Sequence, residues 1–384
     1  MIFNSSPNAT PKIIFVFDQV RHFHVPLFEE LDSRLSARNS QLHLIRGIEP
    51  AAKARGSVSK KVIQNEHAFL LRDFKISTYT VRLALGHLGI IRRLKPDIVV
   101  CPAHPGDLGH WGLIALSKLM GFKLLAWQCG YEYNPGRLKS LLLRYFVPGF
   151  DYHLAYHSNA RNYALEHGAG ESQVEVTHNT INEANFIITD KESARAKLRQ
   201  RHPESGGRRI VLYVGAVLEE KKLERLLEAM ARLAREDVML MIVGDGPHLP
   251  SLRESAKGRT DIVFAGQVID GVGIYFDAAE VYVLPGTGGL GINEAMAHSL
   301  PIISGYADGS ADDLVIDGEN GYRLRENTVE ELADRIGKIL DQPEMAAEMG
   351  RTSHEWITGK FSFQKFLDRV ESALLRQIEP KKNR

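Results

Sequence analysis

The stretch that decides the fold is AEVYVLPGTGGLGINEAMAHSLPII, residues 279–303. The continuous apolar run Val281–Leu284 predicts a strand that is covered on both faces. A glycine-rich turn follows it and leads directly into a helical pattern at Ile292–Ala297. A further short apolar run, Ile302–Ile303, predicts the next strand. Alternation of this kind is typical of a doubly wound parallel sheet.

The same alternation extends through both halves of the chain. In the first half, strands are predicted at Ile13–Phe17, Leu42–Ile45, Ile98–Cys101, Lys123–Trp127, Tyr152–Ala155 and Val174–Thr177, and helices at Pro26–Leu35, Val81–Leu94, Gly112–Leu119 and Asn159–His167. In the second half, further strands are predicted at Ile210–Val214, Met239–Val243 and Ile262–Phe264, and further helices at Lys221–Ala234, Pro247–Lys257, Val329–Leu340 and Glu344–Trp356. The fold class is therefore α/β, with two Rossmann-like domains facing a central cleft.

The length of 384 residues exceeds what one core usually serves, which favours two domains. We place the N-terminal domain at residues 1–190 and a linker at 191–208, because that segment ends in the charged, Gly- and Pro-bearing stretch RHPESGGRR. The C-terminal domain spans 209–360. Residues 361–384 are expected to form a helix that crosses back to the N-terminal domain, followed by a basic tail.

The composition excludes several classes of protein. A net charge of +1 provides no global attraction to nucleic acid. Cys101 and Cys129 lie in apolar, strand-like contexts and are interpreted as reduced thiols. The first ten residues lack the features of a signal peptide, and no apolar run reaches the length of about 18 residues that a membrane span needs. We therefore expect a cytoplasmic protein.

Two glycine-bearing loops are candidates for binding a phosphate. Gly215 ends one strand, and Lys221 follows near the start of the next helix. Gly286, Gly288 and Gly289 follow the Val281–Leu284 strand. Glycines let the backbone approach an anion, a helix start adds partial positive charge, and the lysine adds a full one. These features describe a diphosphate cradle, although the same glycines are also consistent with tight turns alone.

Glu294 is the carboxylate that follows the glycine turn. It either supports the dipole at the start of its helix or accepts hydrogen bonds from ribose hydroxyls beside a bound diphosphate. The chain contains no Asp-x-Asp motif, so no metal is expected at the site.

Four stretches carry a resemblance to a known family. YVGAVLEEKKLERLLEAM (213–230), MIVGDGP (241–247), DIVFAGQV (261–268) and the opening stretch resemble, in order and spacing, the C-terminal domain of family-four glycosyltransferases. Those are retaining, metal-independent enzymes of the GT-B fold that use nucleotide-sugars and no other cofactor. The resemblance is strong over Arg209–Leu340 and looser in the first half, through HVPLFEEL, KPDIVVCPAHPG and VTHNTI.

The resemblance implies roles for individual residues. Lys221 would bind the diphosphate, Glu294 the ribose, and His104, in CPAHPGD, the donor sugar. The implied donor-binding positions are Gly215 in the first glycine loop, Gly266 and Val268 bordering the base, and Gly288, Gly289 and Leu290 at the β-phosphate and sugar hydroxyls. For His104, an ordinary loop position is the alternative.

Two departures from the family pattern leave the donor open. Ala216 stands where the family often has an arginine, and Gly286 stands where it has the first of two glutamates spaced eight residues apart. The arginine would have supplied charge-assisted hydrogen bonds, and the glutamate normally contacts the transferred sugar. An altered donor or a catalytically silent relative are both consistent with these departures.

The first loop, DQVRHFHVP (18–26), carries Arg21, His22 and His24, at the place where relatives bind the acceptor. A plain polar loop before a helix is the alternative. RLKSLLLRYF (137–146) mixes basic and apolar residues at helical spacing, which suits either an anionic membrane surface or an ordinary helix packed on the sheet.

The sequence therefore predicts a metal-independent, retaining hexosyltransferase that moves a sugar from a UDP- or GDP-linked donor to a glycan or lipid-linked acceptor. The expected context is cell-surface polysaccharide assembly in the cytoplasm, with peripheral contact to the inner face of the membrane and no nucleic-acid partner. The alternatives are a nucleotide-sugar epimerase of the same fold, a phosphorylase-like enzyme, and a silent nucleotide-sugar-binding protein.

Overall fold

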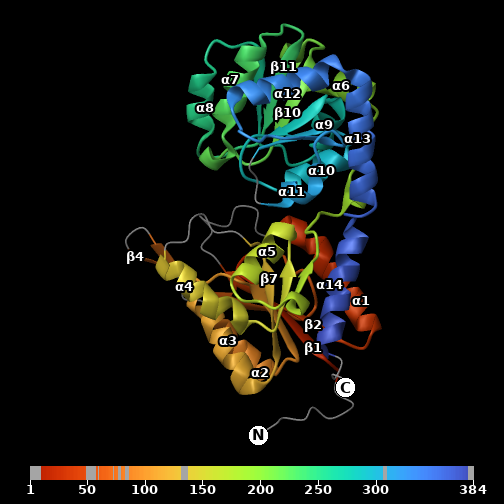
Figure 1. The fold of residues 1–384 in the computed structure, drawn as a ribbon. Coiled ribbons are helices and arrows are strands. Elements are labelled where there is room, and N and C mark those ends of the chain that lie inside the picture. The colour runs from red at the N-terminus through yellow and green to blue at the C-terminus, as the bar shows by residue number, and fades with distance from the viewer. Residues whose placement is uncertain are drawn as a thin grey trace. The chain divides into compact units, whose positions relative to one another are not determined.

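The structure is a computed structural model that describes residues 10–48, 58, 60–71, 73–76, 79–82, 86–130, 137–305 and 309–378. Side chains are described for these residues except 73–76, 79–82 and 137–139. The chain divides into two compact units, and Figure 1 colours them along the sequence. The first unit holds Met1–Asn179 together with Phe366–Arg384, and the second holds Thr180–Lys365.

The first unit is built on a seven-stranded sheet in the order β3-β2-β1-β6-β7-β8-β9, with every neighbouring pair parallel. Its strands are β1 (Lys12–Phe17), β2 (Gln41–Ile48), β3 (Glu66–Leu70), β6 (Ile98–Pro102), β7 (Lys123–Gln128), β8 (Tyr152–Ala155) and β9 (Val174–Val176). Its helices are α1 (Val25–Ala37), α2 (Gly86–Leu94), α3 (Leu108–Met120), α4 (Arg137–Phe146), α5 (Ser158–Glu166) and most of α14 (Phe363–Ile378). Residues 13–17 of β1 are all buried, which explains their unbroken apolar run.

One predicted helix of this unit is wrong at its start. We expected a helix over Val81–Leu94, but β5 (Tyr79–Arg82) pairs antiparallel with β4 (Asp73–Ile76). Residues whose backbone groups bond across a hairpin cannot also enter a helix, so α2 begins only at Gly86. The edge strand β3 was not predicted either, because among its five residues only Phe69 is buried.

Helix α14 lies beside α1 (Figure 1). Arg34 of α1 contacts Asp368 at 2.8 Å and Glu371 at 3.2 Å. Arg38 contacts Glu371 at 2.5 Å, and Glu371 is only 6% exposed. These ion pairs fix the C-terminal helix in the packing of the first unit.

The second unit is built on a six-stranded sheet in the order β12-β11-β10-β13-β14-β15, again parallel throughout. Its strands are β10 (Arg209–Val214), β11 (Val238–Val243), β12 (Ile262–Gly266), β13 (Val281–Leu284), β14 (Ile302–Ser304) and β15 (Gly321–Arg323). Its helices are α6 (Lys191–Arg201), α7 (Leu223–Leu233), α8 (Leu249–Ser255), α9 (Gly273–Ala278), α10 (Leu290–Ala297), α11 (Ser310–Leu314), α12 (Val329–Asp341) and α13 (Pro343–Thr358).

The core of the second unit forms from the central strands and the apolar faces of its helices. Helix α7 buries Leu223, Leu226, Leu227 and Met230, which lie on one face at helical spacing. It packs against α12, while α6 packs against α9 and α10 against α13. Two parallel, helix-covered sheets confirm the predicted α/β fold class with two Rossmann-like domains.

The boundary between the units differs from the predicted linker at 191–208. That segment begins with α6 (Lys191–Arg201), which buries Ala194 and Leu198 against the second unit. The charged stretch that suggested a linker, RHPESGGRR, begins at the last residue of this helix and extends to the first residue of β10. The boundary falls at residues 179–180 instead.

Helix α8 also starts later than predicted. Pro247 was expected at the first helical position, but α8 begins at Leu249, with Pro250 in the first turn. The His248 N–H donates to the Val217 carbonyl at 3.2 Å, which holds the residues before this helix against the loop that follows β10. Within the described residues, no helix combines the length and the apolar character that crossing a bilayer requires.

Candidate functional site

The two glycine-bearing loops of the second unit lie side by side. They follow β10 and β13, which are neighbouring parallel strands, so both loops leave the same edge of the sheet. The Thr287 N–H donates to the Glu220 carbonyl at 3.0 Å, and the Lys221 ammonium donates to the Thr287 carbonyl. These reciprocal bonds join the two loops into one surface.

Gly286 is the point at which the loops approach most closely. A Cβ atom at this position would overlap the Glu220 carbonyl oxygen and would lie 2.5 Å from the carbonyl carbon of Lys221. No side chain fits there unless the backbone moves. The glycine at the place of the family's first glutamate is therefore a requirement of this contact between loops.

Lys221 lies next to the start of α10. A Cβ on Gly288 would lie 3.0 Å from the Lys221 Nζ, and Gly288 has a φ of +148° that favours glycine. Gly289 is the N-cap residue, and Leu290 opens the helix. The first N–H groups of a helix have no acceptor within it and carry partial positive charge. The ammonium and this helix end together form a surface that suits a phosphate.

Glu294 lies one turn into α10 and is half-buried. Burial raises the pKa of its carboxyl group, and His298 partly offsets this effect. In the described residues, no hydrogen bond to the Glu294 carboxylate is found. The start of α10 is fixed nearby, because Gly291 contacts the hydroxyl of Tyr282, which donates to the Val214 carbonyl at 3.2 Å.

The other strand ends at this edge are also joined through glycines. The Gly215 N–H donates to the Val243 carbonyl at 3.0 Å, and the Gly244 N–H donates to the Gly266 carbonyl at 2.8 Å. Gly215 has a φ of +155° and Gly266 a φ of +70°. Gly266 ends β12, two strands from β10, and the partly buried Val268 follows it, so all predicted donor residues of this unit lie at one sheet edge.

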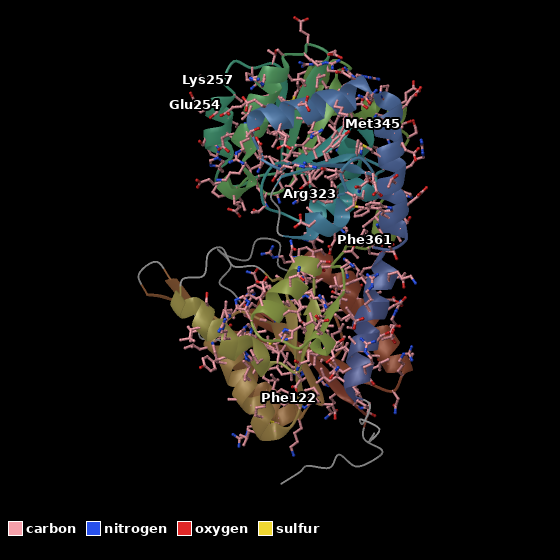
Figure 2. The ribbon with its side chains drawn as sticks, in the orientation of Figure 1. Phe122, Glu254, Lys257, Arg323, Met345 and Phe361 are labelled. Carbon is pink, nitrogen blue, oxygen red and sulfur yellow. The ribbon has the colours of Figure 1, made fainter. Side chains whose placement is uncertain are left out.

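Arg323, labelled in Figure 2, is a cation at the same edge that the sequence analysis missed. It ends β15, donates to the Ser304 hydroxyl at 3.1 Å and to the Gly305 carbonyl, and contacts Asp312 at 2.6 Å. A three-residue strand leaves too short a pattern to predict, so nothing in the sequence marked this position. Its bonds to strand-end carbonyls hold the end of β14.

In the first unit, the predicted acceptor loop and His104 lie at one sheet edge, because β1 and β6 are neighbouring parallel strands. Arg21, His22 and His104 are exposed. His24 is more enclosed, and its Nδ1 accepts the Arg21 N–H at 3.3 Å. Burial, with smaller contributions from Arg21 and His22, lowers the pKa of His24 to about 4, so this ring is neutral at pH 7.

His104 leads into a cluster of potential metal ligands. The His110 Nδ1 lies 3.2 Å from the His104 carbonyl oxygen, and the ligand atoms of Asp18, Asp107 and His110 lie within 4.8 Å of one another. Among the described residues, this is the group whose spacing suits a metal ion. Asp107 also caps α3 by accepting the Gly109 N–H at 2.7 Å. The expectation that no metal takes part stays a prediction.

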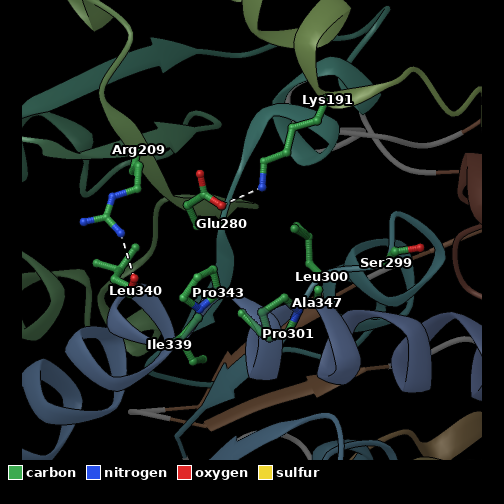
Figure 3. Close-up of a pocket in the computed structure, with 11 residues that line it drawn as sticks. Lys191, Arg209, Glu280, Ser299, Leu300, Pro301, Ile339, Leu340, Pro343 and Ala347 are labelled. Carbon is green, nitrogen blue, oxygen red and sulfur yellow. Dashed lines mark hydrogen bonds and ion pairs between the residues drawn. The ribbon is translucent and has the colours of Figure 1, made fainter.

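A cavity of about 320 Å³ lies in the second unit, and Figure 3 shows its lining. Three of its lining residues lie at the beginnings of strands: Arg209 is the first residue of β10, and Glu280 and Pro301 directly precede β13 and β14. It therefore lies at the sheet edge opposite the glycine loops, and none of the predicted site residues lines it. Lys191 contacts Glu280 at 2.5 Å, and Arg209 donates to the Leu340 carbonyl at 2.7 Å. The charged residues that line the cavity therefore stabilise the packing of the elements around it.

Comparison with known proteins finds a family match within the second unit. Residues 194–356 match the family described as Glycosyl transferases group 1. The chain is 31% identical over 202 residues to an alpha-D-kanosaminyltransferase of Streptomyces kanamyceticus, covering 50% of this chain and 52% of that protein. It is 31% identical over 182 residues to a GDP-mannose-dependent alpha-(1-6)-phosphatidylinositol monomannoside mannosyltransferase of Mycolicibacterium smegmatis, covering 42% and 46%. The chain thus spans about half the length of the curated relatives it matches.

Solved structures match the fold over nearly the whole chain. Anabaena Alr3699/HepE, crystallised with UDP, superposes with a TM-score of 0.75 at 16% identity and covers 95% of this chain and 100% of that one. Sucrose-phosphate synthase from Thermosynechococcus elongatus gives a TM-score of 0.72 at 18% identity and covers 96% and 99%. Together with the family match, these likenesses confirm the predicted resemblance to family-four glycosyltransferases of the GT-B fold.

The loop contact makes Gly286 intolerant of any side chain. We expect Gly286→Ala to lower the free energy of unfolding of the second unit by about 1–3 kcal/mol, because the new Cβ must push two backbones apart. Urea unfolding followed by circular dichroism measures this. Gly337→Ala is the matched control: Gly337 lies inside α12, its Cβ would make ordinary contact with Leu233 at 3.4 Å, and the variant should be neutral or slightly stabilised. Equal stability of the two variants would contradict the contact.

Proposed function

Because its second unit belongs to the glycosyl transferases group 1 family, we propose that this chain is a glycosyltransferase that moves a sugar from a nucleoside diphosphate to a glycan or glycolipid acceptor. The observation that carries the proposal is the contact between the two loops of the second unit. It brings the Lys221 ammonium to the amide end of α10, as a pyrophosphate requires.

The proposed chemistry follows from these groups. As the glycosidic bond breaks, negative charge develops on the leaving diphosphate, and the ammonium together with the amides of residues 288–290 would stabilise it. Lys221 would exchange its bond with the Thr287 carbonyl for one with a phosphate oxygen. No metal is needed for this stabilisation. We propose retention, with the acceptor attacking from the face that the diphosphate leaves and its proton passing to a phosphate oxygen.

Relatives support two bases for the donor. HepE is crystallised with UDP-glucose, and the mannosyltransferase relatives are named as GDP-mannose-dependent. We therefore keep UDP- and GDP-linked hexoses as the proposed donors. Glu294 would accept hydrogen bonds from the ribose, which either base allows, and Gly266 with Val268 would border the base. On the acceptor side, His104, Arg21, His22 and His24 stay proposed contacts.

The structure weakens the case for a silent binding protein. That alternative depended on Gly286 and Ala216 as lost functional residues. Gly286 has a packing role that excludes any side chain, so its identity no longer argues for decay. We propose an active enzyme whose sugar contacts come from residues other than a paired glutamate.

Helix α4 supports peripheral membrane contact. Leu143 and Phe146 are buried, which the ordinary packing of an amphipathic helix explains. Leu141, Leu142 and Tyr145 are 52%, 46% and 69% exposed, however, and packing does not explain this second apolar face. The Arg144 side chain is exposed beside them, while those of Arg137 and Lys139 lie outside the described residues. We propose that this face contacts the inner surface of the membrane in cell-surface polysaccharide assembly.

Lys221→Ala tests the proposed activity. With UDP-glucose, GDP-mannose and related donors, we expect donor hydrolysis or transfer by the wild type and a loss of about 100-fold or more in the variant, because one preorganised cation at the leaving group is removed. Lys257→Ala is the control, since Lys257 is exposed and pairs with Glu254 on the surface, as labelled in Figure 2. Unchanged turnover of Lys221→Ala at saturating donor would refute the role of this lysine.

Glu294→Gln tests the ribose contact. We expect weaker binding of UDP or GDP in calorimetry at pH 8, because the amide offers one poor acceptor where the carboxylate offers two good ones. Because the pKa of Glu294 is raised, the contact should also depend on pH. The affinity of the wild type for the nucleotide should fall as the pH drops through that pKa and the carboxylate takes up a proton. The variant should not show this fall. The same affinity in both proteins would exclude the contact.

The membrane contact is tested by sedimentation with anionic liposomes. We expect the wild type to sediment at low salt and to be released as salt rises, because charge attraction is screened. Leu141→Glu combined with Leu142→Glu should abolish sedimentation. Leu119→Glu, at an exposed leucine of α3, should sediment like the wild type. Failure of the wild type to sediment at low salt would end this proposal.

A further inference from the structure

The C-terminal end of α10 is held by a buried histidine–aspartate pair. The Nδ1 atom of His298 lies 2.6 Å from Oδ1 of Asp277, and the two side chains are 0% and 3% exposed. Asp277 lies on α9, and its Oδ2 accepts the Thr189 N–H at 2.9 Å. The pair therefore connects three segments of the second unit: the last turn of α10, helix α9 and the chain before α6.

Packing alone does not account for a histidine at this position. The ring stacks on Phe276, with centroids 5.2 Å apart and an interplanar angle of 14°. Its Nε2 is buried and has no hydrogen-bond partner within the described part of the chain. Burying an unbonded nitrogen is unfavourable, and an apolar side chain would fill the same space without it. The bond from Nδ1 to Asp277 is thus the feature that a histidine provides here.

His298 lies one turn after Glu294 on the same helix. The His298 N–H donates to the Glu294 carbonyl at 3.1 Å, which makes the two residues successive on one helix face. His298 also lowers the pKa of the Glu294 carboxyl group, against the burial that raises it. A change that displaces His298 therefore acts on the turn of helix that carries Glu294.

We propose that His298 is a positioning residue for nucleotide binding: its bond to Asp277 fixes the last turn of α10 against α9 and so orients the Glu294 carboxylate. The inference rests on the proposed function, in which Glu294 holds the ribose. Helix α9 follows the segment that carries Gly266 and Val268, so the pair also ties the ribose contact to the loop proposed to border the base. Gly273 lies at the start of α9 and faces the same ring. A Cβ there would lie only 3.0 Å from Cε1 of His298, so glycine at this position leaves room for the histidine.

A double-mutant cycle on nucleotide affinity tests the proposal. The single variants are His298→Leu and Glu294→Gln, and the ligand is the tighter of UDP and GDP, measured by calorimetry at pH 8. If His298 acts through Glu294, His298→Leu should weaken binding about tenfold in the wild-type background and less than about twofold in the Glu294→Gln background. An equal loss in both backgrounds, or no loss in the wild type, would overturn the positioning role.

Further variants separate positioning from general damage. His298→Asn places an amide N–H near the position of Nδ1, so it should bind within about threefold of the wild type if the bond to Asp277 is what matters. Affinity as low as that of His298→Leu would overturn the proposal. If His298→Leu does not fold, Asp277→Asn takes its place in the cycle with the same expected outcomes. A wild type that binds neither UDP nor GDP would refute the proposed function itself, a result distinct from additive losses in the cycle.

Discussion

The site depends on one constraint: two loops at the carboxyl ends of β10 and β13 touch through their backbones. The contact exists because Gly286 has no side chain, and it is held by the Thr287 N–H on Glu220 and by Lys221 on the Thr287 carbonyl. From it follows the position of the ammonium beside the first amides of α10. Neighbouring parallel strands make this meeting possible, since their carboxyl ends lie at one edge of the sheet.

The rest of the second unit supports this edge. Tyr282 fixes the start of α10, and the buried His298–Asp277 pair fixes its end. Glu294 lies between these two contacts on α10. The opposite edge has a different character: the charged groups around its cavity are bonded to one another or to backbone, as in ordinary packing.

The sequence predicted the second unit well because its signals are local. Apolar runs placed β10, β11 and β13 within a residue at each end, and the glycines and Lys221 marked the loops. What it missed depends on tertiary contacts. Gly286 appeared as a lost glutamate, because only the facing backbone of Glu220 shows why no side chain fits. The bond between His298 and Asp277 joins residues that are 21 positions apart in the sequence and has no periodic signature. Residues 191–208 appeared to be a linker because the segment ends in the charged, Gly- and Pro-bearing stretch RHPESGGRR, while α6 before it buries only two apolar side chains.

A crystal structure of the chain with UDP tests the central claim most directly. The account predicts the pyrophosphate at the start of α10, with its oxygens bonded to the amides of residues 288–290 and with Lys221 Nζ turned from the Thr287 carbonyl to a phosphate oxygen. A pyrophosphate bound at the cavity on the opposite edge would contradict it. So would one at the glycine loops that leaves Lys221 on Thr287 and out of contact with phosphate.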